Sequence, residues 1–328
     1  MTQHGQVRAA IAQATPIMLD PAAPAAKAAG LVHSAAQAGA RLLLLPEAFV
    51  PAYPRGMGFG TVVGARSLAG RDDFRELWAA SVSVPGPEVD AIAAAARDAR
   101  IHVAVGVVER CHGTLYCTLL LYGDQGELLL HHRKLSPTGA ERLMWGEGDG
   151  STLNVVETPF GRVGGLICWE NYMPLARTAL YAQGVEIYLA PTADARETWQ
   201  ATLRHIACEG RCFVLGCNQF VRRGDDPPHW AERPEIASLP EIACRGGSAV
   251  YSPLGDVLAG PVWDREELIV VELDMDDIAR GKFDFDATGH YGRPDVFELR
   301  VNRSRRSSVV FEPTDEDLTS AGPEANGT

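Results

Sequence analysis

Residues 161–174 constrain the fold of this chain more than any other stretch, because they read as a strand, a tight turn and the start of a helix. The apolar run at 163–167 ends abruptly at Cys168, and Pro174 opens a helical pattern a few residues later. A thiol at such a junction is held on a rigid strand end and faces the positive end of the next helix, which favours the thiolate. The alternative interpretation is a buried cysteine that packs as a small hydrophobe.

Two further polar residues stand where an apolar strand pattern ends. The short run at 41–45 is followed by Pro46 and Glu47, and the strand expected at 127–132 is followed by Arg133 and Lys134. In open α/β sheets the ligand crevice lies beyond the carboxyl ends of the strands. Each residue taken singly is an ordinary surface charge, but together with Cys168 they predict a base, a cation and a nucleophile at one rim.

Strand and helix patterns alternate along both halves of the chain, which is typical of an α/β fold. We expect the other strands at 7–14, 102–108, 115–122, 152–156, 162–167, 186–190, 212–219, 248–251, 256–258 and 267–273. Helices are expected at 22–38, 74–81, 88–100, 174–183 and 199–209. Residues 50–71 and 222–244 read as long loops, and loops of that length in a compact domain are usually functional.

The composition favours a globular protein that handles small molecules. The 328 residues are 46% hydrophobic and carry a formal net charge of -12, which argues against a nucleic-acid surface or a basic membrane patch. We find neither a signal peptide nor an apolar run long enough to span a membrane, and we expect a cytoplasmic protein. From Arg303 the chain becomes arginine-rich and then acidic, and this tail is expected to be disordered.

The seven cysteines do not predict a disulfide scaffold, because their number is odd and the chain has no CxxC pair. Cys208, Cys212 and Cys217, with His205, could suggest a metal site. The last two cysteines, however, lie in a run that reads as a buried strand, which favours core packing.

Glu47, Lys134 and Cys168 resemble the Glu-Lys-Cys triad of the nitrilase superfamily. The motifs around them are Pro46-Glu47, Arg133-Lys134-Leu135-Ser136-Pro137-Thr138 and Cys168-Trp169-Glu170-Asn171. Further matches are Tyr53-Pro54-Arg55-Gly56, Ala190-Pro191-Thr192-Ala193-Asp194, His205-Ile206-Ala207 with Glu209-Gly210, and Gly289-His290-Tyr291 with Arg293-Pro294-Asp295. The resemblance covers residues 6–298, which we interpret as one domain, and leaves residues 299–328 as a C-terminal tail.

The resemblance implies a four-layer α-β-β-α sandwich. Two such subunits would pair into an α-β-β-α-α-β-β-α homodimer, and such dimers often extend into spirals or filaments. It also implies that neither a metal nor an organic cofactor is needed.

The Cys-Trp-Glu-Asn motif is similar to the nitrilase and cyanide-degrading branch, whose chemistry converts a nitrile into a carboxylic acid and ammonia. Cys168 would add to the nitrile carbon to give a thioimidate, and later a thioester. Lys134 would stabilise the negative nitrogen, and Glu47 would move the protons. Glu141 resembles the fourth catalytic residue of the superfamily. The alternatives are a cyanide dihydratase, an aliphatic amidase, or a binding protein on an inactive hydrolase fold.

Five residues are expected to contact the substrate or line its pocket, and two of them, Glu170 and His290, also have a structural interpretation. Tyr53 could line the entrance, and Trp169 is a candidate pocket wall. Glu170 is as well explained as a structural hydrogen-bond partner. Thr192 lies in one of the matched motifs, and His290 could either influence the site or anchor the C-terminal segment.

Overall fold

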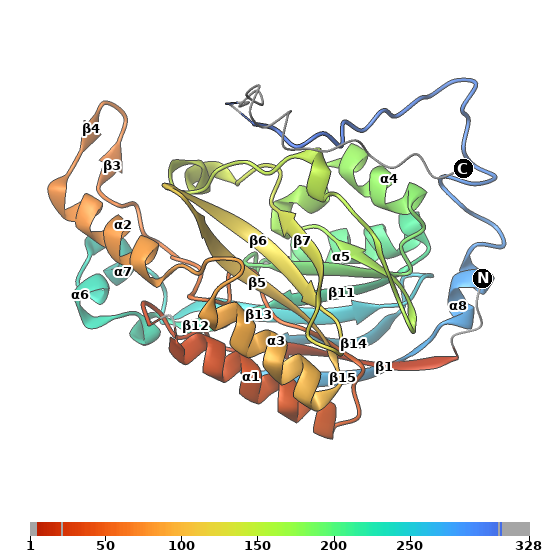
Figure 1. The fold of residues 1–328 in the computed structure, drawn as a ribbon, viewed down its shortest axis with the longest axis horizontal. Coiled ribbons are helices and arrows are strands. Elements are labelled where there is room, and N and C mark those ends of the chain that lie inside the picture. Colours follow the sequence, from red (N-terminus) through yellow and green to blue (C-terminus); the bar gives the residue numbers. More distant parts are fainter. Residues whose placement is uncertain (1–4, 21, 308, 310–328) are drawn as a thin grey trace, which may run out of the picture.

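Two β-sheets built from different parts of the chain form the centre of the protein (Figure 1). The computed structural model describes residues 5–20, 22–307 and 309. Within them, the first sheet has six strands, in the order β15 (Glu267–Asp274), β1 (Gln6–Gln13), β2 (Leu42–Leu44), β5 (His102–Cys111), β6 (Thr114–Tyr122) and β7 (Leu128–Arg133). The second has the order β12 (Phe220–Arg222), β13 (Ile242–Tyr251), β11 (Phe213–Asn218), β10 (Ile187–Thr192), β9 (Gly161–Gly165) and β8 (Val156–Thr158), with β14 (Val257–Trp263) paired to β13.

Helices cover the outer face of each sheet. Helices α1 (Ala22–Gln37) and α3 (Pro87–Ala99) lie side by side over the first sheet, and α4 (Pro174–Ala182) and α5 (Thr198–Gly210) cover the second. The remaining helices are α2 (Leu68–Ala80), α6 (Pro228–Ala231), α7 (Pro234–Ala237) and α8 (Asp276–Gly281). The arrangement confirms the predicted α-β-β-α sandwich.

Side-chain alternation along the strands explains the three apolar layers. In β2, Leu42 and Leu44 point into the core between the sheets, whereas Leu43 packs in the layer under α1 and α3. A strand buried on both faces reads as a continuous apolar run, as this one does. The layer under α4 and α5 is built in the same way from residues such as Leu180 and Tyr188.

The directions of the strands determine where the polar residues predicted at the strand ends lie. Strand β2 runs parallel to β5, and β7 runs parallel to β5 because each is antiparallel to β6. In the second sheet, β9, β10 and β11 are mutually parallel. The residues that follow β2 and β7 are therefore delivered to one edge of the first sheet.

Most predicted elements are confirmed, but the two long loops contain more regular structure than the sequence indicated. Helix α2 begins at Leu68, because Ser67 caps it by accepting a hydrogen bond from the backbone of Gly70 at 3.0 Å. Before it, β3 (Thr61–Val62) and β4 (Ala65–Arg66) form a hairpin that protrudes from the body (Figure 1). The second loop, 222–244, contains α6 and α7, and its two ends belong to β12 and β13.

The strand expected at 152–156 is wrong. Gly150–Thr152 form a short 3-10 helix, and β8 begins only at Val156. The side chain of Asp149 accepts a hydrogen bond from the backbone N–H of Ser151 at 3.0 Å, and such local capping competes with strand pairing.

The C-terminal segment runs along the domain surface up to the limit of the described residues. The guanidinium of Arg303 donates to the side chain of Asn154, and the backbone N–H of Arg306 donates to Asp149 at 2.8 Å. Residues 308 and 310–328, where most of the predicted disordered tail falls, lie outside the described residues. None of the helices in the described part of the chain combines the length and apolar character needed to cross a bilayer.

Candidate active site

A buried ammonium lies between two carboxylates at the centre of the candidate site. Lys134 directly follows β7, and its Nζ donates to Glu47 Oε1 and to Glu141 Oε2, both at 2.8 Å. Lys134 and Glu47 are fully buried, and Glu141 is nearly so. A buried charge is tolerated only when it is paired in this way.

Glu141 uses both of its oxygens within the protein. It lies in the 3-10 helix Gly139–Leu143, and its Oε2 also accepts the backbone N–H of Thr138 at 2.7 Å. Its Oε1 accepts the hydroxyl of Tyr53 at 2.7 Å, and the Tyr53 ring packs edge-on against Trp145. These hydrogen bonds fix the Glu141 carboxylate in the position where it pairs with Lys134, and the Tyr53 hydroxyl is directed at Glu141.

Cys168 lies in a strained turn next to this cluster. It follows β9, opens the 3-10 helix Cys168–Tyr172 and has a φ of 50°, in the left-handed region that non-glycine residues seldom occupy. The Asn171 side chain holds the turn by donating to the carbonyls of Leu166 and Cys168, at 2.9 and 2.8 Å. The Thr192 hydroxyl donates to the Cys168 sulfur at 3.1 Å, which places this predicted residue at the nucleophile itself.

The surroundings of Cys168 oppose the predicted ready ionisation of its thiol. Burial and the negative charge of Glu47 raise the pKa of the Cys168 thiol to about 12, although Lys134 and the Thr192 hydroxyl oppose that shift. A full 3-10 turn separates Cys168 from α4, so the thiol does not sit at the start of that helix. The sequence could not show how completely the turn is buried.

Glu47 has one carboxylate oxygen free to take a proton. It follows β2, and its Oε1 accepts from Lys134 and, at 3.5 Å, from the buried thiol of Cys117. Its Oε2 is buried without a hydrogen-bond partner among the described residues. Burial raises the pKa of Glu47 despite the opposing charge of Lys134. These properties suit a general base for Cys168.

The side chains of Trp169, Glu170 and His290 contact groups other than the three triad side chains. The Trp169 indole, partly exposed, donates to Asp194 at 2.9 Å. Glu170 is buried, and both of its oxygens accept backbone N–H groups. The exposed ring of His290 packs against Tyr291, and no interaction described in the structure joins it to the triad.

Sequence reasoning missed three residues that surround the triad. Cys117 comes from β6, Trp145 follows the 3-10 helix of Glu141, and His132 lies two residues before Lys134. His132 hydrogen-bonds to Glu170, and the Lys134 ammonium lies 5.9 Å from the centre of the Trp145 ring. Of the three, only His132 could have been identified from the sequence, because residues two apart on a strand share a face and His132 lies two residues before Lys134.

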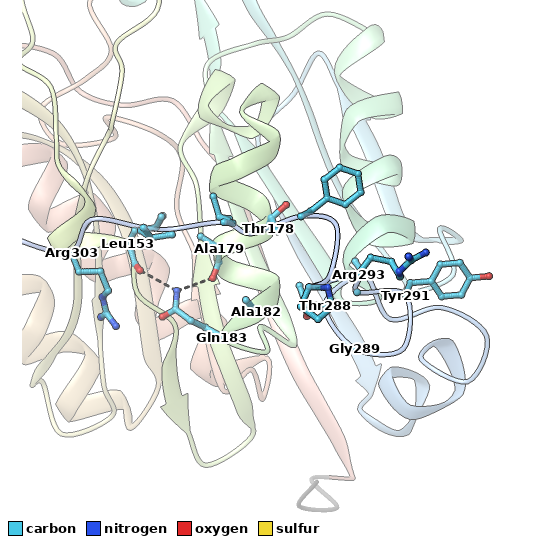
Figure 2. A pocket seen from close by; sticks show the side chains of 16 residues that line it. Leu153, Thr178, Ala179, Ala182, Gln183, Thr288, Gly289, Tyr291, Arg293 and Arg303 are labelled. Atoms are coloured by element: carbon cyan, nitrogen blue, oxygen red, sulfur yellow. Dashed lines mark hydrogen bonds between the residues drawn. The ribbon is translucent and has the colours of Figure 1, made fainter.

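A separate cavity of about 640 Å³ lies between α4 and the C-terminal segment (Figure 2). Tyr291, Thr288 and Arg293 line one side, and Gln183 closes the other, where it donates to the carbonyls of Leu153 and Ala179. No residue of the triad lines this cavity.

The described residues contain no cluster of three or more His, Cys, Asp or Glu side chains able to hold a metal ion. Cys208, Cys212 and Cys217 are free thiols, and the last two are buried in the core, as the strand interpretation predicted.

Because its pKa is raised to about 12, the Cys168 thiol is expected to keep its proton throughout the neutral range. The thiolate fraction should stay below about 1% until the pH exceeds about 10. The ultraviolet thiolate absorbance of the wild type minus that of Cys168→Ala, followed during an alkaline titration, measures it. Cys212→Ala serves as a control for another buried thiol, and a titration step near neutral pH that disappears only in Cys168→Ala would contradict the expectation.

Comparison with known proteins places this site in a family. Residues 8–283 match the family model of carbon-nitrogen hydrolases. The chain is 52% identical to the bifunctional nitrilase/nitrile hydratase NIT4A of Lupinus angustifolius, over 93% of this chain and 88% of that protein. It is 49% identical to the aliphatic nitrilase of Sinorhizobium fredii (strain HH103), over 92% and 98%.

A solved structure supports the same assignment at the level of the fold. The carbon-nitrogen hydrolase from Helicobacter pylori G27 superposes with a TM-score of 0.66 and 19% identity, over 86% of this chain and 93% of that one. The match to the family model spans both sheets, α1, α3, α4 and α5, and all of the residues that surround Lys134. The chain belongs to the carbon-nitrogen hydrolase family, as the resemblance of Glu47, Lys134 and Cys168 to the nitrilase triad predicted.

Proposed function

We propose that the protein is a nitrilase that converts organic nitriles into carboxylic acids and ammonia. The observation that carries this proposal is a buried Glu-Lys-Cys cluster in a chain about half identical to proteins named as nitrilases. The cluster supplies a base, a cation and a sulfur nucleophile, the groups that addition to a nitrile requires.

In the first step, the Cys168 sulfur bonds to the nitrile carbon while its proton passes to Glu47. Concerted transfer suits a thiol whose pKa is raised to about 12, and the unpartnered Oε2 of Glu47 is the acceptor. One electron pair of the carbon–nitrogen triple bond moves to nitrogen, where the Lys134 ammonium stabilises the negative charge in a site without bulk water. Transfer of the proton from Glu47 to nitrogen completes a thioimidate.

In the second step, Glu47 takes a proton from a water that adds to the thioimidate carbon. The tetrahedral intermediate then expels ammonia and leaves a thioester, which a second water hydrolyses to the acid and free Cys168 thiol. If the intermediate instead expels the thiol, the product is the amide. Partition between these two routes accounts for a relative named both nitrilase and nitrile hydratase.

Cyanide dihydratase and aliphatic amidase use chemistry that the same triad supports, so substrate tests separate them. We expect ammonia and carboxylic acid from phenylacetonitrile, benzonitrile or an aliphatic dinitrile, and little ammonia from cyanide or from the matching amides. The measurement is ammonia release together with chromatographic analysis of acid and amide. Turnover of amides or cyanide alone would keep the family assignment and overturn the proposal of a nitrilase.

Substitutions in the triad test the roles of its members. Cys168→Ala removes the nucleophile and Glu47→Gln removes the base, so each should lower kcat by at least about 10,000-fold. Lys134→Met, which keeps the volume of the side chain, should do the same. Ammonia release by folded protein, verified by circular dichroism, is the readout. Cys212→Ala, a buried thiol remote from Lys134, should retain full activity, and a triad variant that kept comparable activity would remove that residue from the mechanism.

We also propose that the protein forms a homodimer through the face of α4 and α5. Exposed apolar side chains gather beside this face: Tyr172 and Met173 precede α4, Leu175 lies in its first turn and is 66% exposed, and Phe297 from the C-terminal segment is 78% exposed. Pairing through α4 and α5 would give the eight-layer arrangement. The exposed tip of the β3–β4 hairpin, with Val62 and Val63, supports a second contact that could extend dimers into filaments.

A cytoplasmic location belongs to the same proposal. Its support is that all seven cysteines are free thiols, which suits a reducing compartment.

The two proposed contacts predict different effects of two substitutions. Leu175→Asp places a charge in the proposed dimer face and should convert dimers into monomers, whereas Val63→Asp should leave the dimer intact and remove larger assemblies. Sedimentation velocity measures both. Wild-type protein that sediments as a monomer, or a Leu175→Asp variant that remains dimeric, would contradict the proposed dimer face.

A further inference from the structure

The carboxylate of Glu170 links two separate pieces of backbone. Its Oε1 accepts the N–H of Leu135 at 2.6 Å, and its Oε2 accepts the N–H of Ile167 at 2.8 Å. Glu170 is 1% exposed, so these hydrogen bonds are shielded from water. The geometry leaves neither oxygen free for a substrate.

The two donors are the immediate neighbours of two triad members. Leu135 follows Lys134, which leaves β7 in the first sheet, and Ile167 precedes Cys168, which follows β9 in the second sheet. Strands β7 and β9 belong to different sheets and are not hydrogen-bonded to one another. Glu170 therefore joins the segment of the cation directly to the segment of the nucleophile.

His132 completes this link from the first sheet. Its Nε2 lies 3.1 and 3.2 Å from the two oxygens of Glu170, and its Nδ1 lies 3.2 Å from the Thr152 hydroxyl. Burial alone would raise the pKa of Glu170, but His132 and the two backbone N–H groups hold that pKa below its usual value. The carboxylate consequently stays ionised at neutral pH and remains an acceptor for all three donors.

We propose that Glu170 and His132 are positioning residues that fix the Lys134 ammonium relative to the Cys168 sulfur. The inference rests on the proposed nitrilase mechanism, in which the cation must meet the nitrogen while the sulfur meets the carbon of the same nitrile. A displacement of about 1 Å between reacting groups can cost roughly 100-fold in rate. The strained φ of Cys168 increases this dependence, because such a conformation persists only when its surroundings fix it.

Glu170→Gln is the direct test, because an amide replaces one acceptor oxygen by an NH2 group that faces a backbone N–H. We expect kcat for the best nitrile to fall about 100-fold while KM changes less than about threefold. A substrate-binding role would instead raise KM. As a second readout that needs no nitrile turnover, alkylation of Cys168 by iodoacetamide, followed by peptide mass spectrometry, should slow at least about tenfold.

Two substitutions of His132 test whether an N–H donor to Glu170 is sufficient at this position. His132→Gln keeps an N–H donor and should retain kcat within about tenfold of wild type, whereas His132→Leu leaves Glu170 without its side-chain donor and should resemble Glu170→Gln. Since the two residues act as a unit, Glu170→Gln combined with His132→Leu should lose little more than either alone.

Glu186→Gln is the matched control. Glu186 is also buried and accepts a backbone N–H, that of Arg162 at 2.8 Å, but it stands before β10, at the end of these parallel strands opposite Cys168. Its substitution should lower the melting temperature about as much as Glu170→Gln while leaving kcat and alkylation unchanged. Equal loss of kcat in both variants would reduce Glu170 to a general stabiliser and overturn the inference.

The remaining outcomes distinguish failure of the positioning inference from failure of the proposed function. If the wild type turns over nitriles and folded Glu170→Gln matches it in kcat, the positioning inference fails and the proposed function stands. If the wild type turns over no nitrile, the proposed function fails, and the rate of alkylation still decides whether Glu170 positions Cys168. Should Glu170→Gln not fold, the difference between His132→Gln and His132→Leu decides, and equal kcat values in those two would overturn the inference.

Discussion

The ion cluster of Lys134, Glu47 and Glu141 is the interaction on which the rest of the site depends. Its members are withdrawn from water, and each is tolerable there only because the others are present. Removing Lys134 would leave two like charges facing one another in a buried space, and removing either carboxylate would leave an ammonium less than fully paired. The groups proposed to do the chemistry are thus also the groups that make their own burial possible.

This cluster also affects the protonation of the Cys168 thiol before a substrate binds. A cysteine near a lysine would ordinarily ionise more readily, yet the carboxylate of Glu47 and complete burial outweigh Lys134 at Cys168. In the proposed mechanism the thiol therefore keeps its proton until Glu47 accepts it, as the sulfur bonds to the substrate.

The sequence predicted the triad from polar residues at the ends of apolar strands and from their resemblance to the nitrilase triad. In the structure Glu47 and Lys134 are hydrogen-bonded to each other. Glu47 and Lys134 follow β2 and β7, as expected, and the unbroken leucine run of β2 correctly indicated a strand buried on both faces. The raised pKa of the Cys168 thiol was not expected from the sequence, since it depends on how much protein covers the turn. The bridging role of Glu170 could not be predicted, because its three donors come from segments that meet only in the folded sheets. The start of α2 was missed because its first turn, with Leu68 exposed, lacks the apolar contacts that a periodic pattern detects.

The proposed catalytic groups are divided between two sheets that share one apolar interior, and this division has a mechanical consequence. Any slip of one sheet over the other would separate Lys134 from Cys168 before it unfolded either sheet. The interior between the sheets therefore helps to keep Lys134 in position relative to Cys168. The layers beneath the outer helices serve mainly to hold each sheet together. Substitutions should be better tolerated in those outer layers. The rigidity of the interior between the sheets should set the temperature at which turnover ceases.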